Sequence, residues 1–328
     1  MQYRTLGKTG FNISNISLGT WQVGGKWGSG FDHDLAQSIL RSAIDQGVNF
    51  IDTADVYEAG ESEKAVGKAV REFDERIYVA TKCGRQINPH VSEGYTPKAL
   101  RGYVEDSLKR LGLEQIDLIQ LHCPPWEVYY RPEIFGLFED LKAEGKIAHL
   151  GVSVEKVEQA MKALEFDNVA SVQIIYNMFR QRPEEHFFEA AKAKNVGIIV
   201  RVPLASGLLT GKFSKSSTFG AGDHRHGNRN GEWFDKGETF AGIPFETGLE
   251  AVDQLEGFLP AGYPLTHAAL QWILRRPEVS TIIPGASRAE QVDSNLAAAG
   301  AVPLSDDVLK KIQGLYEADI KPLVHQLW

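Results

Sequence analysis

Four polar side chains of complementary acid–base types occur at or just after short apolar runs. Asp52 ends one such run and Tyr57 follows it, Lys82 ends the next run, and His122 ends the one after that. A short apolar run is typical of a buried strand, and in parallel α/β proteins ligands bind at the carboxyl ends of the strands. Because neighbouring strands lie ~4.8 Å apart, we expect the four side chains to converge at one edge of the sheet.

These residue types are suited to proton transfer to an oxygen. A free tyrosine has a pKa of about 10, and an adjacent ammonium group lowers that pKa because it stabilises the phenolate. Lys82 can supply the ammonium, Asp52 can hold Lys82 charged and oriented, and His122 can hydrogen-bond a substrate oxygen. A tuned phenol that protonates an oxygen is what carbonyl reduction requires. The hydride must come from a cofactor, because no side chain supplies one.

Each residue also has a plainer explanation. A buried Asp52–Lys82 ion pair can belong to the barrel structure, and a single His122 after a strand is usually a polar residue with satisfied hydrogen bonds. Lys82 alone also fits the Schiff-base lysine of a barrel aldolase or isomerase, but Tyr57 would then have no role. The occurrence of all four at consecutive strand ends favours the shared functional site.

The elements that would position these residues alternate between strand and helix. Eight strand–helix units predict a (β/α)8 TIM barrel, an α/β fold, in a single domain spanning 1–328. A doubly wound sheet normally has a GxGxxG turn after its first strand, whereas this chain has Gly19-Thr20-Trp21 there. The predicted strands are 15–18, 48–52, 77–82, 116–122, 150–153, 171–175, 197–202 and 281–283, and the predicted helices are 34–46, 61–71, 97–111, 132–144, 157–164 and 184–194.

Three segments lie outside the repeating pattern. Residues 3–13 predict an N-terminal β-hairpin around Lys8-Thr9-Gly10 that caps one end of the barrel. Two extra helices, 246–259 and 265–275, are expected between strands seven and eight. Residues 214–243 form a long polar stretch, and loops of that length are usually functional or mobile.

Composition narrows the possible partners. The chain has 328 residues and a net charge of −8, which argues against nucleic acid or an anionic membrane as partner. The two cysteines are expected to be reduced. Met1-Gln2-Tyr3-Arg4 opens no signal peptide and no apolar run reaches 18 residues, so we expect a cytoplasmic protein with a small-molecule partner. The sequence leaves the oligomeric state open.

Almost the whole chain resembles the aldo-keto reductase family, in particular a bacterial branch that is similar to potassium-channel β subunits. The resemblance implies NADP(H) bound across the barrel mouth without a Rossmann fold, in preference to NAD(H). It also implies that Tyr57 is the proton donor, assisted by Lys82, Asp52 and His122. The matching stretches are 4–10, 18–21, 50–54 with Tyr57, 81–82, 121–122, 145–146 through 151–153, Gln173 with 176–177, 203–212, and 283–287 through Asn295.

The resemblance also implies where a nucleotide would bind. Ser153 and Gln173 would face the nicotinamide carboxamide, and Arg201 stands where the family usually has an aromatic residue. A turn after strand seven would hold phosphates, and Ser287 and Arg288 would contact the 2′-phosphate; the plainer alternatives are an ordinary loop and a helix cap. The full expected cofactor set is Gly19, Thr20, Trp21, Asp52, Ser153, Gln173, Arg201, Val202, Pro203, Leu204, Ser206, Gly207, Lys212, Arg225, Gly285, Ser287, Arg288, Gln291 and Asn295.

The expected substrate pocket contains Trp21, Tyr57, His122 and Trp126, and no metal site is predicted. Two functions follow as alternatives. The first is an NADP(H)-dependent oxidoreductase that reduces an aldehyde or ketone, or oxidises the matching alcohol or sugar, with Tyr57 as general acid/base. The second is a cofactor-binding regulatory or interaction protein with slow turnover. The intact set of four polar residues favours the first.

Overall fold

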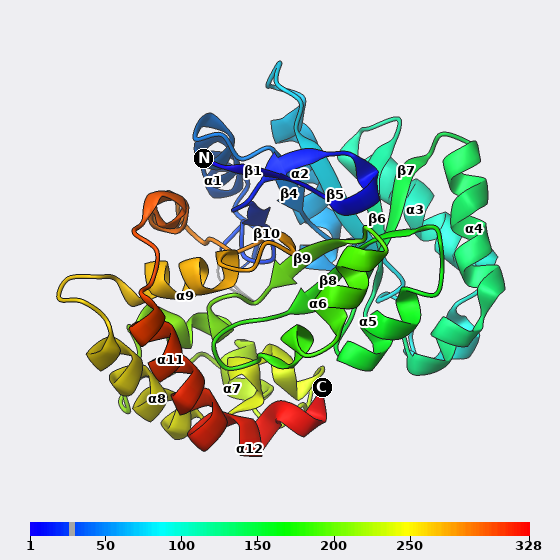
Figure 1. The fold of residues 1–328 in the computed structure, drawn as a ribbon. Helices are drawn as coiled ribbons and strands as arrows, with labels where there is room; N and C mark the ends of the chain where they lie inside the picture. The colour runs from blue at the N-terminus through cyan, green and yellow to red at the C-terminus, as the bar shows by residue number, and fades with distance from the viewer. Residues whose placement is uncertain (26–29) are drawn as a thin grey trace.

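The computed structural model describes residues 1–25 and 30–328, and it is a (β/α)8 barrel, as the sequence predicts. Eight parallel strands lie in the middle and helices surround them (Figure 1). The strands run in chain order around the sheet, each beside the next. They are β3 (Leu18–Gly19), β4 (Phe50–Asp52), β5 (Tyr78–Cys83), β6 (Ile116–His122), β7 (Ile147–Ser153), β8 (Val169–Ile175), β9 (Gly197–Arg201) and β10 (Val279–Ile282).

The first and last strands meet through isolated contacts instead of a full ladder. Ile16 bridges Ile282 and Gly19 bridges Gly285, both in the parallel sense. The Ser17 amide donates to the Ile282 carbonyl at 2.8 Å. The predicted first strand, 15–18, is therefore reduced to a two-residue strand preceded by bridging residues.

Two of the outer helices, α1 and α3, begin at residues that capping rules favour. The Asp32 side chain accepts a hydrogen bond from the Leu35 amide at the start of α1, and Thr96 caps the start of α3 in the same way. Gly112 ends α3 in the left-handed conformation, φ 63°. The outer helices are α1 (His33–Asp45), α2 (Glu61–Val70), α3 (Pro97–Leu111), α4 (Pro132–Ala143), α5 (Val157–Ala163) and α6 (Phe187–Ala193).

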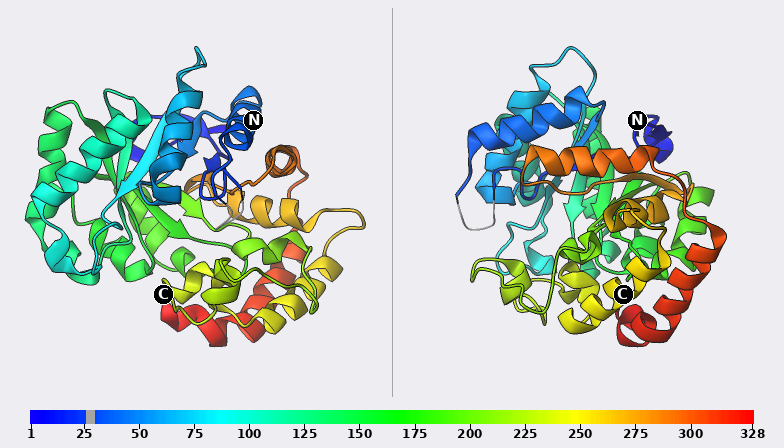
Figure 2. Two further views of the ribbon diagram at one scale, coloured as in Figure 1. Left: turned by 180° about the vertical axis from the view of Figure 1, so that it is seen from behind. Right: turned by 90° about the vertical axis from the view of Figure 1, so that its left-hand side faces the viewer.

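Additional helices follow β9 and β10 in the chain. As predicted, α8 (Phe245–Phe258) and α9 (Leu265–Leu274) lie between β9 and β10. After β10 follow α10 (Ala289–Ala297), α11 (Asp306–Leu315) and α12 (Lys321–Val324), and α11 and α12 lie on the same side as α8 (Figure 2). Within the described residues, no helix combines the length and the apolar character that crossing a membrane needs.

The N-terminal hairpin, β1 (Tyr3–Thr5) and β2 (Asn12–Ser14), closes one mouth of the barrel, as expected. Leu6 and Ile13 from the hairpin pack against the inward-facing Phe50, Ala80 and Leu118, and this cluster is separate from the large core between strands and helices. Apolar side chains thus fill the amino-terminal half of the barrel. The polar residues at the strand ends are left to form the opposite mouth.

Candidate active site

Lys82 lies at the centre of the polar group at the carboxyl ends of the strands. Its ammonium donates to the Asp52 carboxylate, to the Thr53 carbonyl at 2.8 Å and to the Tyr57 hydroxyl at 3.3 Å. An ammonium group has three hydrogens, so these three acceptors use its full capacity. Lys82 is 1% exposed. It therefore contacts Tyr57 from inside the protein, and the opposite side of the phenol is left for a ligand.

Asp52 is fixed by two glutamine side chains as well as by Lys82. Its second carboxylate oxygen accepts hydrogen bonds from Gln120 at 2.9 Å and from Gln173 at 2.8 Å. In the sheet register Lys82 lies opposite Gln120, which brings the glutamine amide to the same level. The sequence analysis did not single out Gln120, although a lone amide inside an otherwise apolar strand was a usable signal.

Tyr57 follows β4 in a turn with unusual backbone angles. The next two residues, Glu58 and Ala59, have φ of 45° and 52°. The Tyr57 ring centroid lies 6.1 Å from that of His122 and 6.4 Å from that of Trp21. The Nδ1 atom of His122 is buried and has no hydrogen-bond partner among the described residues. A buried polar atom without a partner is costly.

The protonation states suit a proton donor. Burial raises the pKa of Tyr57 and the Lys82 ammonium opposes that rise, so the phenol stays protonated at neutral pH. Burial acts to lower the pKa of Lys82, but Asp52 and Tyr57 outweigh it and the pKa is raised. Burial, with Lys82 and Arg85 nearby, lowers the pKa of His122 well below its usual range, so the imidazole is neutral. The sequence argument gave Lys82 the dominant effect on Tyr57, whereas in the structure burial has the larger one.

A cavity of about 490 Å³ opens directly over these residues. Its size falls in the range of ~300–1,000 Å³ that small-molecule sites occupy. The expected site residues that line it are Gly19, Thr20, Trp21, Asp52, Tyr57, His122, Ser153, Gln173, Arg201, Val202, Pro203, Leu204, Ser206, Gly207, Lys212, Arg225, Gly285, Arg288 and Gln291. Lining residues that the sequence analysis did not name include Arg85, Phe213, His224, Phe234 and Glu238.

Three of the expected ligand-contacting residues are not among the residues that line the cavity. Trp126 is 39% exposed and packs against Tyr129 and Tyr130, because the 3-10 turn after β6 directs it to the surface. Asn295 is buried and donates to the Gly285 carbonyl at 3.4 Å. The Ser287 hydroxyl hydrogen-bonds to Gln291 at 3.2 Å.

The turn after β9 lines the cavity with an unusual backbone. Val202, Ala205, Ser206 and Gly207 have φ of 52°, 46°, 56° and 98°. The Ala205 and Gly207 amides donate to carbonyls within the turn, at 3.1 and 2.9 Å. Lys212 and Arg288 line the same cavity, so its positive charge suits the phosphates of a dinucleotide.

The segment 214–243 folds over the cavity and includes the short helix α7 (His224–Gly227). The His224 ring lies 5.0 Å from Trp21, and Phe234 lies 6.2 Å from the same indole. Arg225 is held by Asp223 and lies 4.9 Å above the Phe219 ring. The segment is therefore a structured part of the cavity wall. Its polar and glycine-rich sequence did not predict that structure.

Arg201 is held by protein groups on two sides. Its guanidinium pairs with Glu238 at 3.2 Å and donates to the Val154 carbonyl at 3.0 Å. It also approaches the Cys123 sulfur at 3.7 Å. Cys123 itself does not line the cavity, and its backbone is left-handed, φ 47°.

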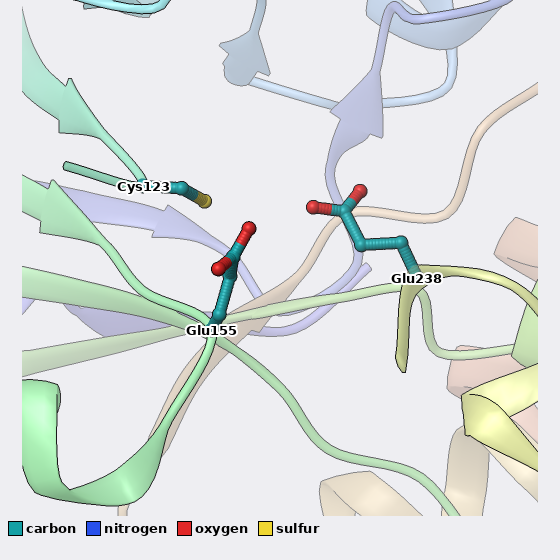
Figure 3. Close-up of side chains that lie close together, drawn as sticks. All are labelled: Cys123, Glu155 and Glu238. Atoms are coloured by element: carbon teal, nitrogen blue, oxygen red, sulfur yellow. The ribbon is translucent and has the colours of Figure 1, made fainter. Parts of the chain in front are cut away.

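Cys123, Glu155 and Glu238 come from three separate segments, and their side-chain ends point into a shared space (Figure 3). One ligand-type atom from each lies within 4.8 Å of the other two. Two guanidinium groups lie beside this cluster: Arg85 is 3.5 Å from Glu155, and Arg201 pairs with Glu238. Burial raises the pKa of Cys123 to about 11, so the thiol stays protonated. The cluster is therefore an ion-pair network in the cavity wall.

Comparisons with known proteins agree with this geometry. The model of the Aldo/keto reductase family matches residues 15–317. The chain is 32% identical to aldo-keto reductase YhdN of Bacillus subtilis, over 90% of this chain and 87% of that protein. It is 30% identical to an NADH-specific methylglyoxal reductase of Escherichia coli, over 92% and 94% of the two chains.

Two further matches extend the range of relatives. The chain is 30% identical to a probable voltage-gated potassium channel subunit beta of Arabidopsis thaliana, over 98% of each chain. The solved structure of the glycerol dehydrogenase AKR11B4 from Gluconobacter oxydans superposes with a TM-score of 0.79 at 29% identity, covering 97% of this chain and 96% of that one. The similarity thus extends over the barrel and its additional helices.

Proposed function

The chain belongs to the aldo/keto reductase family, and from that premise we propose that it is an NADP(H)-dependent oxidoreductase that interconverts an aldehyde or ketone with its alcohol. The observation that carries the proposal is the contact between Lys82 and the Tyr57 hydroxyl at the base of the cavity. A structural ion pair between Lys82 and Asp52 would not need a tyrosine hydroxyl turned toward a cavity.

In this proposal Tyr57 is the general acid of reduction and the general base of oxidation. A bound reduced nicotinamide supplies the hydride when a carbonyl is reduced. The Tyr57 hydroxyl donates its proton to the carbonyl oxygen, and Lys82 stabilises the phenolate that remains. The neutral His122 ring, which shares the cavity wall, hydrogen-bonds the same oxygen and orients it. Asp52, held by Gln120 and Gln173, keeps Lys82 charged.

The residues that would hold the nucleotide fit NADP(H). Ser153 and Gln173 would lie at the nicotinamide end, and the turn 202–207, with Lys212, lines the cavity where the diphosphate would bind. Arg288 lies at the start of α10, where a helix N-terminus attracts anions. Its positive charge favours the 2′-phosphate of NADP(H) over NAD(H). One relative is named NADH-specific, so both nucleotides belong in any assay.

A regulatory role is the second candidate, because one relative is named a probable potassium channel subunit beta. A protein of that kind would bind the nucleotide tightly and turn over slowly. The complete set of Asp52, Tyr57, Lys82 and His122 around one cavity favours catalysis, since a regulatory nucleotide site has no use for a proton donor.

The test is oxidation of NADPH and of NADH by the purified protein, followed by absorbance with a panel of aldehydes, ketones and sugars. The oxidoreductase proposal predicts turnover of at least one carbonyl compound, faster with NADPH than with NADH. Tight NADPH binding without turnover of any compound in the panel would favour the regulatory alternative.

A further inference from the structure

Arg85 is a cavity-lining cation that the reaction described above does not use. It lies two residues beyond β5 and lines the same cavity as Tyr57 and His122. Its only ion pair among the described residues is a 3.5 Å contact with Glu155, and its guanidinium makes no hydrogen bond within that part of the chain. Its side chain is 24% exposed. A guanidinium group has five N–H donors, so a partly buried one without hydrogen bonds has strong unused donor capacity.

The other arginine close to the catalytic tyrosine differs in this respect. Arg201 donates to the Val154 carbonyl at 3.0 Å and pairs with Glu238 at 3.2 Å. The guanidinium of Arg201 is therefore already engaged by protein groups. Of these two arginines, Arg85 is the one whose donors make no hydrogen bond to the described residues, so they are open to a bound molecule.

The backbone that presents Arg85 is constrained. Gly84 has φ 101°, and a side chain there would meet the Tyr95 ring at 2.8 Å, so the turn before Arg85 requires glycine. The Tyr95 hydroxyl hydrogen-bonds to His90 at 2.8 Å within the same loop. The guanidinium fork is planar and rigid, so little conformational freedom is lost for each hydrogen bond that it makes to a ligand.

We propose that Arg85 binds an anionic group of the substrate, a carboxylate or a phosphate, and that the preferred substrate is a carbonyl compound with such a group beyond the carbonyl that is reduced. This inference rests on the proposed oxidoreductase function. The planar guanidinium fork matches both oxyanions, which it can bind through two parallel hydrogen bonds.

The acidic residues near Arg85 do not exclude an anion. Glu238 is paired with Arg201. Burial raises the pKa of Glu155 to about 7, with Asp235 and Glu238 adding to the rise, so Glu155 carries only part of a negative charge near neutral pH. Its contact with Arg85 is long for an ion pair. Arg85 therefore retains positive charge toward the cavity.

The test compares matched substrates in the full-length protein, in Arg85→Gln, in Arg85→Lys, and in the control Arg41→Gln on the exposed face of α1. The pairs are succinic semialdehyde with butanal, and glyceraldehyde 3-phosphate with glyceraldehyde. We expect the wild type to favour the anionic member of at least one pair in kcat/KM by about tenfold or more, because hydrogen bonds to charged groups are strong. Arg85→Gln should abolish that preference and change the neutral member less than about threefold.

The outcomes separate the possibilities. A preference in only one pair identifies the anion as carboxylate or phosphate, and Arg85→Lys should retain part of it. Equal activity on both members of each pair in the wild type, or an undiminished preference in Arg85→Gln, would overturn the inference while leaving the oxidoreductase proposal intact.

Absence of turnover with every compound would count against the proposed function. In that case a binding measurement still tests whether Arg85 binds an anion. Calorimetric titration with butanoate, inorganic phosphate and the neutral butanamide, with NADP⁺ present, should show anion binding that is weakened about tenfold or more in Arg85→Gln. Identical anion binding in the wild type, Arg41→Gln and Arg85→Gln would overturn the inference without reference to catalysis.

Discussion

The Lys82 ammonium lies 3.3 Å from the Tyr57 hydroxyl, and 4.9 Å from the centre of the same ring. In the proposed reaction the lysine would stabilise the phenolate that remains after proton transfer, while burial keeps the resting phenol protonated. This relationship connects the barrel register, which brings β4 and β5 together, to the acid–base chemistry of the cavity.

The pH dependence of carbonyl reduction should be nearly flat. The raised pKa of Tyr57 keeps the acid protonated, and the lowered pKa of His122 keeps the imidazole neutral. With a neutral substrate, which avoids any effect at Arg85, we expect kcat/KM to change by less than about threefold between roughly pH 6 and 9. Initial rates at saturating NADPH measure this, and a tenfold fall between pH 7 and 9 would show that the phenol ionises earlier than its burial implies.

Arg288 should determine the choice between the two nucleotides. It lines the cavity at the start of α10, and its side chain is 57% exposed. Arg288→Ala should raise the KM for NADPH about tenfold and leave the KM for NADH within a factor of about two, because the adenosine 2′-phosphate is present only in NADPH. Lys310→Ala, a change at an exposed lysine of α11, serves as the matched control. Equal losses for both nucleotides would place Arg288 on a shared part of the cofactor.

Asp55 should make the protein less stable as the pH rises. Both carboxylate oxygens are buried without hydrogen-bond partners among the described residues, and burial, with Glu63 nearby, raises its pKa to about 7. Between about pH 4 and 7 the folded state holds a proton that the unfolded state has lost. The free energy of unfolding therefore falls as the pH rises through this range. The loss is complete above about pH 7, where the carboxylate is charged in both states.

Asp55→Asn removes the buried charge and should therefore stabilise the protein at high pH. The gain in unfolding free energy over the wild type should widen by on the order of 2 kcal/mol between pH 5 and pH 8. Urea denaturation at both values measures it, with the exposed Asp45→Asn as control. A gain that stays constant with pH would mean that Asp55 does not titrate in this range.

Trp328 should influence nucleotide binding from outside the cavity. Its indole nitrogen donates to Asp235 at 2.9 Å, and Asp235 caps the 3-10 turn that carries Glu238 to Arg201. Ser206, in the turn after β9, donates to the Glu238 carbonyl at 2.9 Å. Loss of the indole should therefore loosen both of these segments of the proposed nucleotide site.

In Trp328→Ala we expect NADPH, measured by calorimetry, to bind about five- to tenfold more weakly than in the wild type. Trp328→Phe keeps a ring but loses the hydrogen bond, so its affinity for NADPH should be intermediate. Leu327→Ala, next to it and 40% exposed, is the control. Wild-type affinity in Trp328→Ala would show that segment 235–240 holds its position without the indole.

The sequence predicted the barrel because its strands are short apolar runs that alternate with helical segments, and several of these runs end in a polar residue. It was less accurate at the amino ends of β7 and β8, which begin at Ile147 and Val169, a few residues before the predicted strands. His149 interrupts the apolar run of β7, yet it lies inside the strand because its ring packs edge-on against Phe11 of the hairpin, with centroids 5.0 Å apart. Tertiary contacts of that kind have no local sequence signal.

The candidate site was predictable where residues end strands, and not where they reach the cavity from loops. Lys82 and His122 were found because they follow apolar runs. Glu238 reaches the cavity from a segment with no periodicity, and the surface position of Trp126 depends on the turn after β6. The position of Arg85 depends on the backbone angle of Gly84, which spacing alone does not reveal.

The most direct test of the account is single-turnover oxidation of bound NADPH in the wild type and in Tyr57→Phe, with NADPH affinity measured on the same samples. Phenylalanine keeps the ring beside Lys82 but removes the proton donor. We expect unchanged NADPH binding in Tyr57→Phe and a rate of hydride transfer reduced about a hundredfold or more, since positioned acids contribute roughly 10²–10⁴. Hydride transfer in Tyr57→Phe within about twofold of the wild-type rate would contradict the assignment of Tyr57 as the acid, and with it the proposed mechanism.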